Sequence, residues 1–311
     1  MKSLRECLHE YLAMRRALGF GLKKDERLLL EFTAFMERLR AKRITVKLAL
    51  KWAQRTGSTD RNYHAGRLRA IRSFARYRIL IDPRTEIPSA DILPRQRRLF
   101  HPHLYSEDEI RRLLAATLQR RRSATSISRW ARFTLFGLLS VTGLRVSEAL
   151  NLDLEDVDLD QGILTIRNSK FGKSRLVPVH PSTRAALTDY LRRRNEYFTD
   201  RPIVPFFVSR HGTRMGHTNV YKTFLILSRK LGLRKPSDRQ GPRLHDLRHS
   251  MAVKVLRRCG QTGADPERRL PALSTYLGHT NLSHTYWYLH QNPSLMKQAM
   301  TRLEDRWEGS P

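Results

Sequence analysis

Prolines recur over one short segment between two long stretches of this chain, at Pro83, Pro88, Pro94 and Pro102. Proline lacks a backbone N–H and clashes with the preceding turn, so no helix can continue through the segment. The segment is also basic, with Arg84, Arg95, Arg97 and Arg98. At 311 residues the chain is long enough for two domains, each with its own core. We therefore expect a first domain over residues 1–82, a basic linker over 83–104 and a second domain over 105–311.

The first domain is predicted to be all-helical. Apolar residues recur there at helical period, at Leu28, Leu29, Leu30, Phe32, Phe35, Met36 and Leu39. Thr45 has the side chain of an N-cap for a following helix, which carries Trp52 and ends near Gly57. A further helix is expected to begin near Asp60 and to bury Leu68 and Phe74.

Charge points to the kind of partner. The net charge is +30, from 59 Lys and Arg against 29 Asp and Glu, while 40% of the residues are hydrophobic. That hydrophobic share indicates a folded protein rather than a disordered one. A surface so strongly basic repels itself unless a polyanion is present, and nucleic acid is the obvious counterpart. The alternative is a soluble protein that is merely basic.

Arginines also surround the helix that begins near Asp60, at Arg61, Arg67, Arg69, Arg72, Arg76 and Arg78, with almost no acids to pair them. Arginines on a helix often form only a solvated face, but this density favours contact with phosphates. The predicted DNA-binding residues are Arg61, Arg67, Arg69, Arg72 and Arg76, together with Arg95, Arg97 and Arg98 of the linker.

Cysteine usage and the N-terminus bear on the compartment. Cys7 and Cys259 lie far apart and form neither a disulfide framework nor a zinc ribbon. Charges of both signs occupy the first residues, without the apolar run of a signal peptide, and no uncharged stretch approaches the roughly 20 residues of a membrane helix. We expect a soluble, cytoplasmic protein that associates with the nucleoid and not with a membrane.

The second domain is predicted to be mainly α with a small antiparallel β-sheet. Ser106, followed by three acids, has the pattern of an N-cap, and residues 130–140 form an apolar helix. Between residues 152 and 179 the apolar residues alternate around two glycine turns, which predicts about three strands. Helical patterns resume over residues 182–194 and 219–231, and from Leu244 to the end.

Chemistry-bearing residues concentrate in this domain, in the order Arg145, Lys170, His245, Arg248, His279 and Tyr288. A tyrosine nucleophile, cations that neutralise a phosphorane-like transition state and a lysine or histidine that moves protons suit covalent phosphoryl transfer without a metal. Taken singly each residue is a weak signal. Arg145 could be a surface arginine paired with Glu148, a lysine on a hairpin is usually solvated, and Tyr286 competes with Tyr288.

The spacing of the residues around Arg248 adds geometry. On a helix His245 and Arg248, three residues apart, share one face, whereas His249 projects roughly 100° away and is expected to be structural. Tyrosine has an unperturbed pKa of about 10, so nearby arginines are needed to favour its phenolate. His279 follows Leu277 and Gly278, which predict a helix end.

This constellation resembles the tyrosine recombinase (phage integrase) family from about Tyr105 to Met300, with the helical region before it similar to the family's core-binding domain. The motifs are residues 142–148 (TGLRVSE), 245–249 (HDLRH) and 277–279 (LGH), with Tyr288 nine positions beyond His279. The resemblance implies that Arg145 and Arg248 stabilise the transition state and that Lys170 is the general acid of a β-hairpin, with Lys173 as its rival. It also implies that His245 and His279 contact the scissile phosphate, that Glu148 supports the site and that Tyr288 is the nucleophile.

The same resemblance implies site-specific recombination of double-stranded DNA through a 3′-phosphotyrosyl intermediate and a Holliday junction. Neither metal, ATP nor another cofactor is expected. A homotetramer on two DNA sites is implied, with accessory proteins or sister recombinases as further partners. The apolar stripe of a tail helix would pack within its own subunit or into a neighbour, at Leu295, Met296, Ala299, Met300 and Leu303. The long connection after Leu256 and the long first domain favour a bacterial mobile genetic element as the context, while integration, transposition and resolution all stay open as its role.

Other readings stay open. A type IB topoisomerase or a telomere resolvase shares the tyrosine and the cations, and a DNA-binding protein could keep the fold without cleavage. A zinc site built from the C-terminal histidines has little support from their spacing. Residues 257–269 make a longer connection than the family pattern has, which concerns local geometry rather than chemistry.

Overall fold

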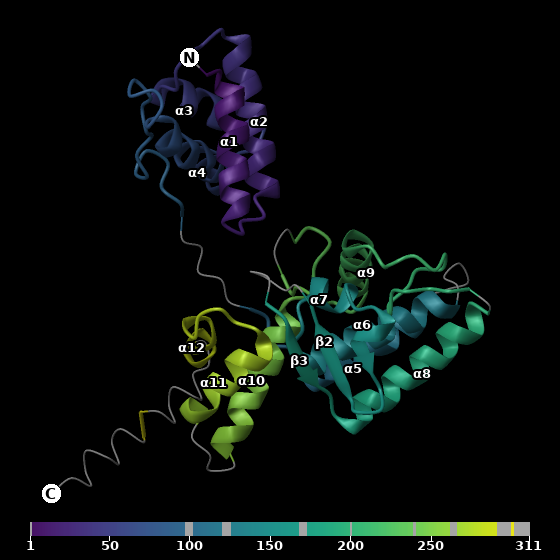
Figure 1. Cartoon of the computed structure of the whole chain (residues 1–311). Helices are drawn as coiled ribbons and strands as arrows, with labels where there is room; N and C mark the ends of the chain where they lie inside the picture. The colour runs from purple at the N-terminus through teal and green to yellow at the C-terminus, as the bar shows by residue number, and fades with distance from the viewer. Residues whose placement is uncertain are drawn as a thin grey trace, which may run out of the picture. The chain divides into compact units, whose positions relative to one another are not determined.

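A computed structural model describes residues 2–96, 102–119, 126–167, 173–199, 201–238, 241–261, 266–290 and 300–301. The chain divides into two compact units, Met1–Phe100 and His101–Pro311 (Figure 1). The calls on Lys170, Arg97 and Arg98 lie outside the described residues, as does most of the predicted tail helix. The boundaries predicted at 82 and 105 remain a prediction.

The first unit contains α1 (Leu4–Ala17), α2 (Lys23–Arg38), α3 (Val46–Gln54) and α4 (Arg61–Arg78). Local signals start these helices where the sequence predicts. The Thr45 side chain accepts a hydrogen bond from the backbone N–H of Leu48 at 3.2 Å, and Asp60 accepts one from that of Asn62 at 2.9 Å. Both bonds satisfy N–H groups that a helix leaves unpaired. The N-cap predicted at Thr45 is confirmed, as is the helix start expected near Asp60, where Asp60 is the cap.

The core of the first unit is the common apolar face of the helices. Leu8, Phe32, Trp52 and Phe74 are buried together, one from each helix. Burying such side chains supplies most of the stability of a helical unit, at roughly 1.5–3 kcal/mol each. The segment after α4 packs onto this unit, since the backbone N–H of Glu86 donates to the carbonyl of Ile44 at 3.0 Å.

The second unit begins with helices. α5 (Glu107–Leu118) starts at the predicted Ser106 cap, where Ser106 and Glu109 form a reciprocal capping box. The apolar run becomes α6 (Ser126–Thr142), followed by α7 (Val146–Leu150) and the 3₁₀ turn η1 (Leu154–Asp156).

The predicted sheet follows as β1 (Val157–Asp158), β2 (Ile163–Ile166) and β3 (Arg175–Pro178), paired antiparallel in the order β1-β2-β3. Leu164 pairs with Val177 across β2 and β3, and both side chains are buried. The expectation of a mainly α fold with a small antiparallel sheet is confirmed.

The unit is completed by α8 (Pro181–Tyr197), α9 (His217–Lys230), α10 (Asp246–Gln261), α11 (Pro266–Leu277) and α12 (Ser283–His290). α6 packs against α5, α8 and α10 and is the centre of the larger core. A second cluster joins α10, α11 and α12 through Met251, Leu256, Leu273 and Tyr288. Figure 1 shows these three helices grouped beside β3, an arrangement that positions the site described below. None of the described helices is both long and apolar enough to span a membrane.

Candidate active site

Arg145 stands on a tight turn between α6 and α7. Gly143 has φ +62°, a left-handed conformation that favours glycine, and a Cβ there would also displace the end of the Met251 side chain, 2.8 Å away. Arg145 is the N-cap residue just before α7, and its guanidinium donates to the Glu148 carboxylate at 2.5 Å and to the carbonyl of Gly278 at 3.0 Å. The pairing with Glu148 expected of a surface arginine is present, but the partner is buried in the site.

Glu148 is held by two arginines. Besides Arg145, Arg175 on β3 donates to both carboxylate oxygens, at 3.2 and 2.8 Å. Burial by itself would raise the pKa of Glu148, but the hydrogen bonds from Arg175 and Arg145 outweigh it and the pKa is lowered. The carboxylate is therefore kept ionised and fixes Arg145.

Arg248 lies on the first turn of α10 and is 2% exposed. Its guanidinium donates to the carbonyls of Gly143 and Leu277, both at 2.7 Å, and makes a side-chain hydrogen bond with Tyr288. Burial lowers the pKa of Arg248 to about 10, which leaves the side chain charged at neutral pH. The charge lies beside the tyrosine oxygen.

The ring of His249 contacts two other rings of this region. The ring of His249 lies 4.9 Å from that of His245 and 5.4 Å from that of Tyr288, measured between centroids. His249 was expected to project away from Arg248 and to be structural, and its ring lies against those of His245 and Tyr288. The angle of roughly 100° separates His249 from Arg248 but leaves it on the side of His245, four residues earlier.

His279 and Tyr288 lie side by side, one in the turn after α11 and the other on α12. α11 ends at Leu277 as predicted, and the His279 ring stacks near that of Tyr288 at 6.1 Å. Nδ1 of His279 is 2.7 Å from the Thr285 hydroxyl, which orients the imidazole. Burial raises the pKa of Tyr288, and the neighbouring Arg248 opposes that shift. Tyr288 is 2% exposed, whereas the competitor Tyr286 is 39% exposed.

The site therefore joins Arg145 just before α7, His245 just before α10, Arg248 on α10, His279 in the turn after α11 and Tyr288 on α12. Lys170 falls between β2 and β3, outside the described residues, and the rival Lys173 is exposed. Sequence reasoning missed Arg175, although its place in the Lys-x-x-Lys-x-Arg pattern is a signal that could have found it. No group of three or more His, Cys, Asp or Glu is placed to hold a metal ion in the described ranges.

The predicted DNA-binding arginines of the first unit differ in their surroundings. Arg61, Arg76 and Arg95 are exposed. Arg69 also reaches solvent but pairs with Asp25 at 3.1 Å, and Arg72 donates to the carbonyls of Pro88 and Ser89.

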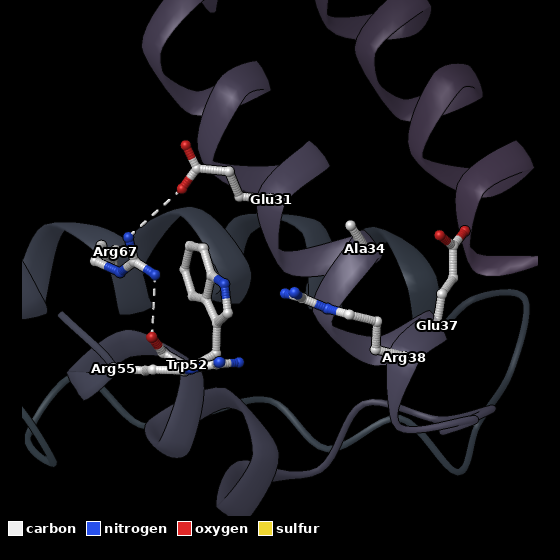
Figure 2. A pocket seen from close by; sticks show the side chains of 7 residues that line it. All are labelled: Glu31, Ala34, Glu37, Arg38, Trp52, Arg55 and Arg67. Atoms are coloured by element: carbon white, nitrogen blue, oxygen red, sulfur yellow. Dashed lines mark hydrogen bonds and ion pairs between the residues drawn. The ribbon is translucent and has the colours of Figure 1, made fainter.

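Arg67 is the exception, being 5% exposed. Its guanidinium lies 3.6 Å from the Trp52 ring centroid and donates to the Trp52 carbonyl at 3.0 Å. Figure 2 shows Arg67 beside Trp52 in a surface hollow of the first unit, with an ion pair of 3.6 Å to Glu31. These contacts commit Arg67 to packing and leave little of it for a phosphate.

Acid sensitivity follows from the histidine cluster. Burial lowers the pKa of both His249 and His279 to about 3, with the positive charge of His245 adding to the first shift and that of Arg248 to the second. In the unfolded chain the pKa of each imidazole is about 6.5. Between about pH 6.5 and pH 3 the unfolded chain therefore binds protons that the folded chain does not bind. Stability is therefore full above about pH 6.5 and falls toward pH 3, by at most about 1.4 kcal/mol per pH unit for each histidine.

We expect the unfolding temperature of the second unit to fall steadily from pH 7 to pH 5 in scanning calorimetry. A His249→Gln protein should lose part of this slope, because one titrating ring is gone. His217, exposed at the start of α9, provides the control, and His217→Gln should keep the wild-type slope. An equal pH dependence in all three proteins would contradict the assignment.

Comparison with known proteins shows the family of this chain. The family described as "Phage integrase family" matches residues 104–294. The putative integrase/recombinase y4rB of Sinorhizobium fredii is 49% identical over 311 residues, covering 99% of each chain. Another from the same organism, y4rE, is 35% identical over 300 residues and covers 96% of this chain and 95% of that protein.

The fold has solved counterparts as well. The Tn1549 transposon integrase in complex with transposon right end DNA aligns with a TM-score of 0.66 at 16% identity, over 97% of this chain and all of that one (100%). The chain belongs to the phage integrase family and is a tyrosine site-specific recombinase.

Proposed function

We propose that this recombinase cuts and rejoins double-stranded DNA through a 3′-phosphotyrosyl bond to Tyr288, with Arg145, His245, Arg248 and His279 around the scissile phosphate. The observation that carries the proposal is the convergence of these side chains from separate segments, with Arg248 hydrogen-bonded to the Tyr288 oxygen. Two arginines can neutralise charge that develops on the nonbridging oxygens, and they are fixed in place before DNA arrives.

The chemical step balances without a cofactor. The Tyr288 oxygen forms a bond to phosphorus while the bond to the 5′ oxygen breaks. A neutral imidazole, His245 or His279, is suited to accept the phenol proton, and Lys170 supplies a proton to the leaving 5′ oxygen. A second DNA's 5′-hydroxyl then reverses the step, passing through a Holliday junction. The ester conserves the bond energy, so no ATP is consumed.

Access to Tyr288 requires movement. The side chain is 2% exposed, so its oxygen cannot reach a DNA phosphate while α12 packs as described. The shift of α12 would also have to keep Tyr288 near Arg248 and Arg145. Burial raises the pKa of the phenol, and the charges of these two arginines lower it and so favour the phenolate.

For binding we favour the exposed Arg61, Arg76 and Arg95 as phosphate contacts, with Arg97 and Arg98 beside them in sequence. Assembly as a homotetramer on two DNA sites, together with accessory or sister proteins, follows by likeness to the family. We place the protein at the nucleoid of the cytoplasm and assign it to a mobile genetic element. The full set of motif residues argues against a binder that has lost catalysis, and family membership favours a recombinase over a topoisomerase.

The test is to trap the protein on nicked DNA taken from the flanks of its own gene. A nick near the cut lets a short fragment diffuse away, so a cleaving enzyme stays attached. We expect a band that survives a denaturing gel and, by mass spectrometry, a nucleotide adduct on the peptide containing Tyr288. An adduct on Tyr286, or tight binding without any adduct across the flanking DNA, would contradict the proposal.

A further inference from the structure

Arg175 links three segments that the proposed chemistry uses. It opens β3, the strand that follows the segment containing Lys170, and its side chain is 11% exposed. Nη1 and Nη2 donate to the Glu148 carboxylate on α7, and Nε donates to the carbonyl of Tyr276 on α11 at 2.9 Å. One guanidinium thus ties β3, α7 and the end of α11 together.

The carboxylate held by Arg175 is the same one that holds Arg145. Glu148 accepts from the Arg145 guanidinium at 2.5 Å and from its backbone N–H at 3.0 Å. Glu148 is almost wholly buried, so it cannot exchange these partners for water without cost. The direction of the Arg145 side chain therefore depends on where Arg175 sets the carboxylate.

Gly278 shows how tightly Arg175 fits against the turn before His279. A Cβ at Gly278 would lie 2.7 Å from Nη1 and 2.9 Å from Cζ of Arg175. Gly278 has φ +68°, and its carbonyl accepts from Arg145 at 3.0 Å. The two guanidiniums thus contact the same glycine, one through its carbonyl and one at the place of its missing side chain.

Arg175 is itself poorly placed to bind a phosphate. Each of its three nitrogens already donates to an acceptor inside the protein. Arginine can donate two hydrogen bonds to one carboxylate and a third to a carbonyl, because its guanidinium is planar and carries N–H groups on three nitrogens. A lysine ammonium lacks this planar arrangement of donors.

We propose that Arg175 is a positioning residue, which aligns Arg145 and the His279 turn with the strand leading from Lys170. The inference rests on the proposed function, since it concerns the same site. A misplacement of about 1 Å at a reacting group costs up to roughly a hundredfold in rate, and loss of a supporting partner costs about 10- to 100-fold. Removing Arg175 should therefore slow cleavage without weakening DNA binding.

The test measures single-turnover cleavage of the nicked DNA and, separately, DNA affinity. Arg175→Ala should cleave roughly 10- to 100-fold more slowly than wild type, with the dissociation constant for DNA changed less than about threefold. Arg214→Ala is the matched control, because Arg214 also grips a carboxylate, Asp153, and the carbonyls of Leu150 and Leu152. That variant should cleave within about threefold of wild type, because Arg214 touches none of the proposed catalytic residues.

Arg175→Lys covers the case in which the alanine variant does not fold. It keeps a charge beside Glu148 but cannot hold both carboxylate oxygens and the Tyr276 carbonyl at once. We expect it to unfold near the wild-type temperature and to cleave several-fold more slowly than wild type. Cleavage by Arg175→Lys at the wild-type rate would overturn the inference.

A double-mutant cycle decides whether Arg175 acts through Arg145. If it does, Arg175→Ala should add almost nothing to the defect of Arg145→Lys, since the group being aligned is already altered. Multiplied defects would overturn the inference, as would an equal loss of DNA affinity. Failure of the proposed function looks different, because the wild type itself would then form no adduct, or Arg145→Lys would cleave normally.

Discussion

A Tyr288→Phe protein is expected to bind DNA as the wild type does and to form no covalent adduct. Only the phenol oxygen is removed, so the ring keeps its packing beside His249 and His279. The nucleophile itself disappears, and the yield of adduct on nicked DNA should fall by at least about a thousandfold. Denaturing gels of trapped complexes, run beside a binding assay, measure both quantities.

Tyr286→Phe provides the matched control on the same helix. Both tyrosines lie on α12, but Tyr286 is 39% exposed and Tyr288 only 2%. Its loss should leave the adduct at the wild-type level. Adduct formation by Tyr288→Phe, together with its loss in Tyr286→Phe, would move the nucleophile to Tyr286.

Arg248→Met is expected to lose both catalysis and stability. Methionine fills much of the volume but leaves the carbonyls of Gly143 and Leu277 without their donor, at roughly 1–3 kcal/mol for each buried unpaired group. The loss of a positive charge at the phosphate should slow cleavage by about a hundred- to a thousandfold. Thermal unfolding and single-turnover cleavage measure the two effects.

Arg194→Met separates these effects. Arg194 is also buried and also donates to two carbonyls, those of Ile203 and Pro205, but it lies outside the candidate site. We expect a similar loss of stability and, below the unfolding temperature, nearly normal cleavage. If Arg194→Met slowed cleavage as much as Arg248→Met does, the catalytic role of Arg248 would reduce to its part in folding.

The sequence alone predicts much of the fold, because the signals involved are local. The N-caps at Thr45 and Ser106 and the helix start near Asp60 depend on residues two or three positions away, and the structure confirms all three. The alternation through residues 152–179 likewise reports a sheet whose neighbouring strands are close in sequence. The identity and order of the six site residues also pointed to the family without any knowledge of their positions in space.

The burial and the partners of the site residues depend on packing between segments that are far apart in the sequence. In the sequence Arg67 has the same pattern as the other arginines of α4 that were predicted to bind DNA. In the fold its guanidinium is buried against the ring of Trp52, 15 residues earlier, and donates to the Trp52 carbonyl. His249 was expected to be structural from its angle to Arg248, but only the packing of α12 against α10 brings its ring against that of Tyr288. Arg175 and Glu148 are 27 residues apart on different elements, and only the folded chain brings them together. The sequence by itself therefore determined the elements, the family and the chemical groups. Which of those groups are buried, paired and aimed at one another depends on contacts between distant segments, which no local pattern encodes.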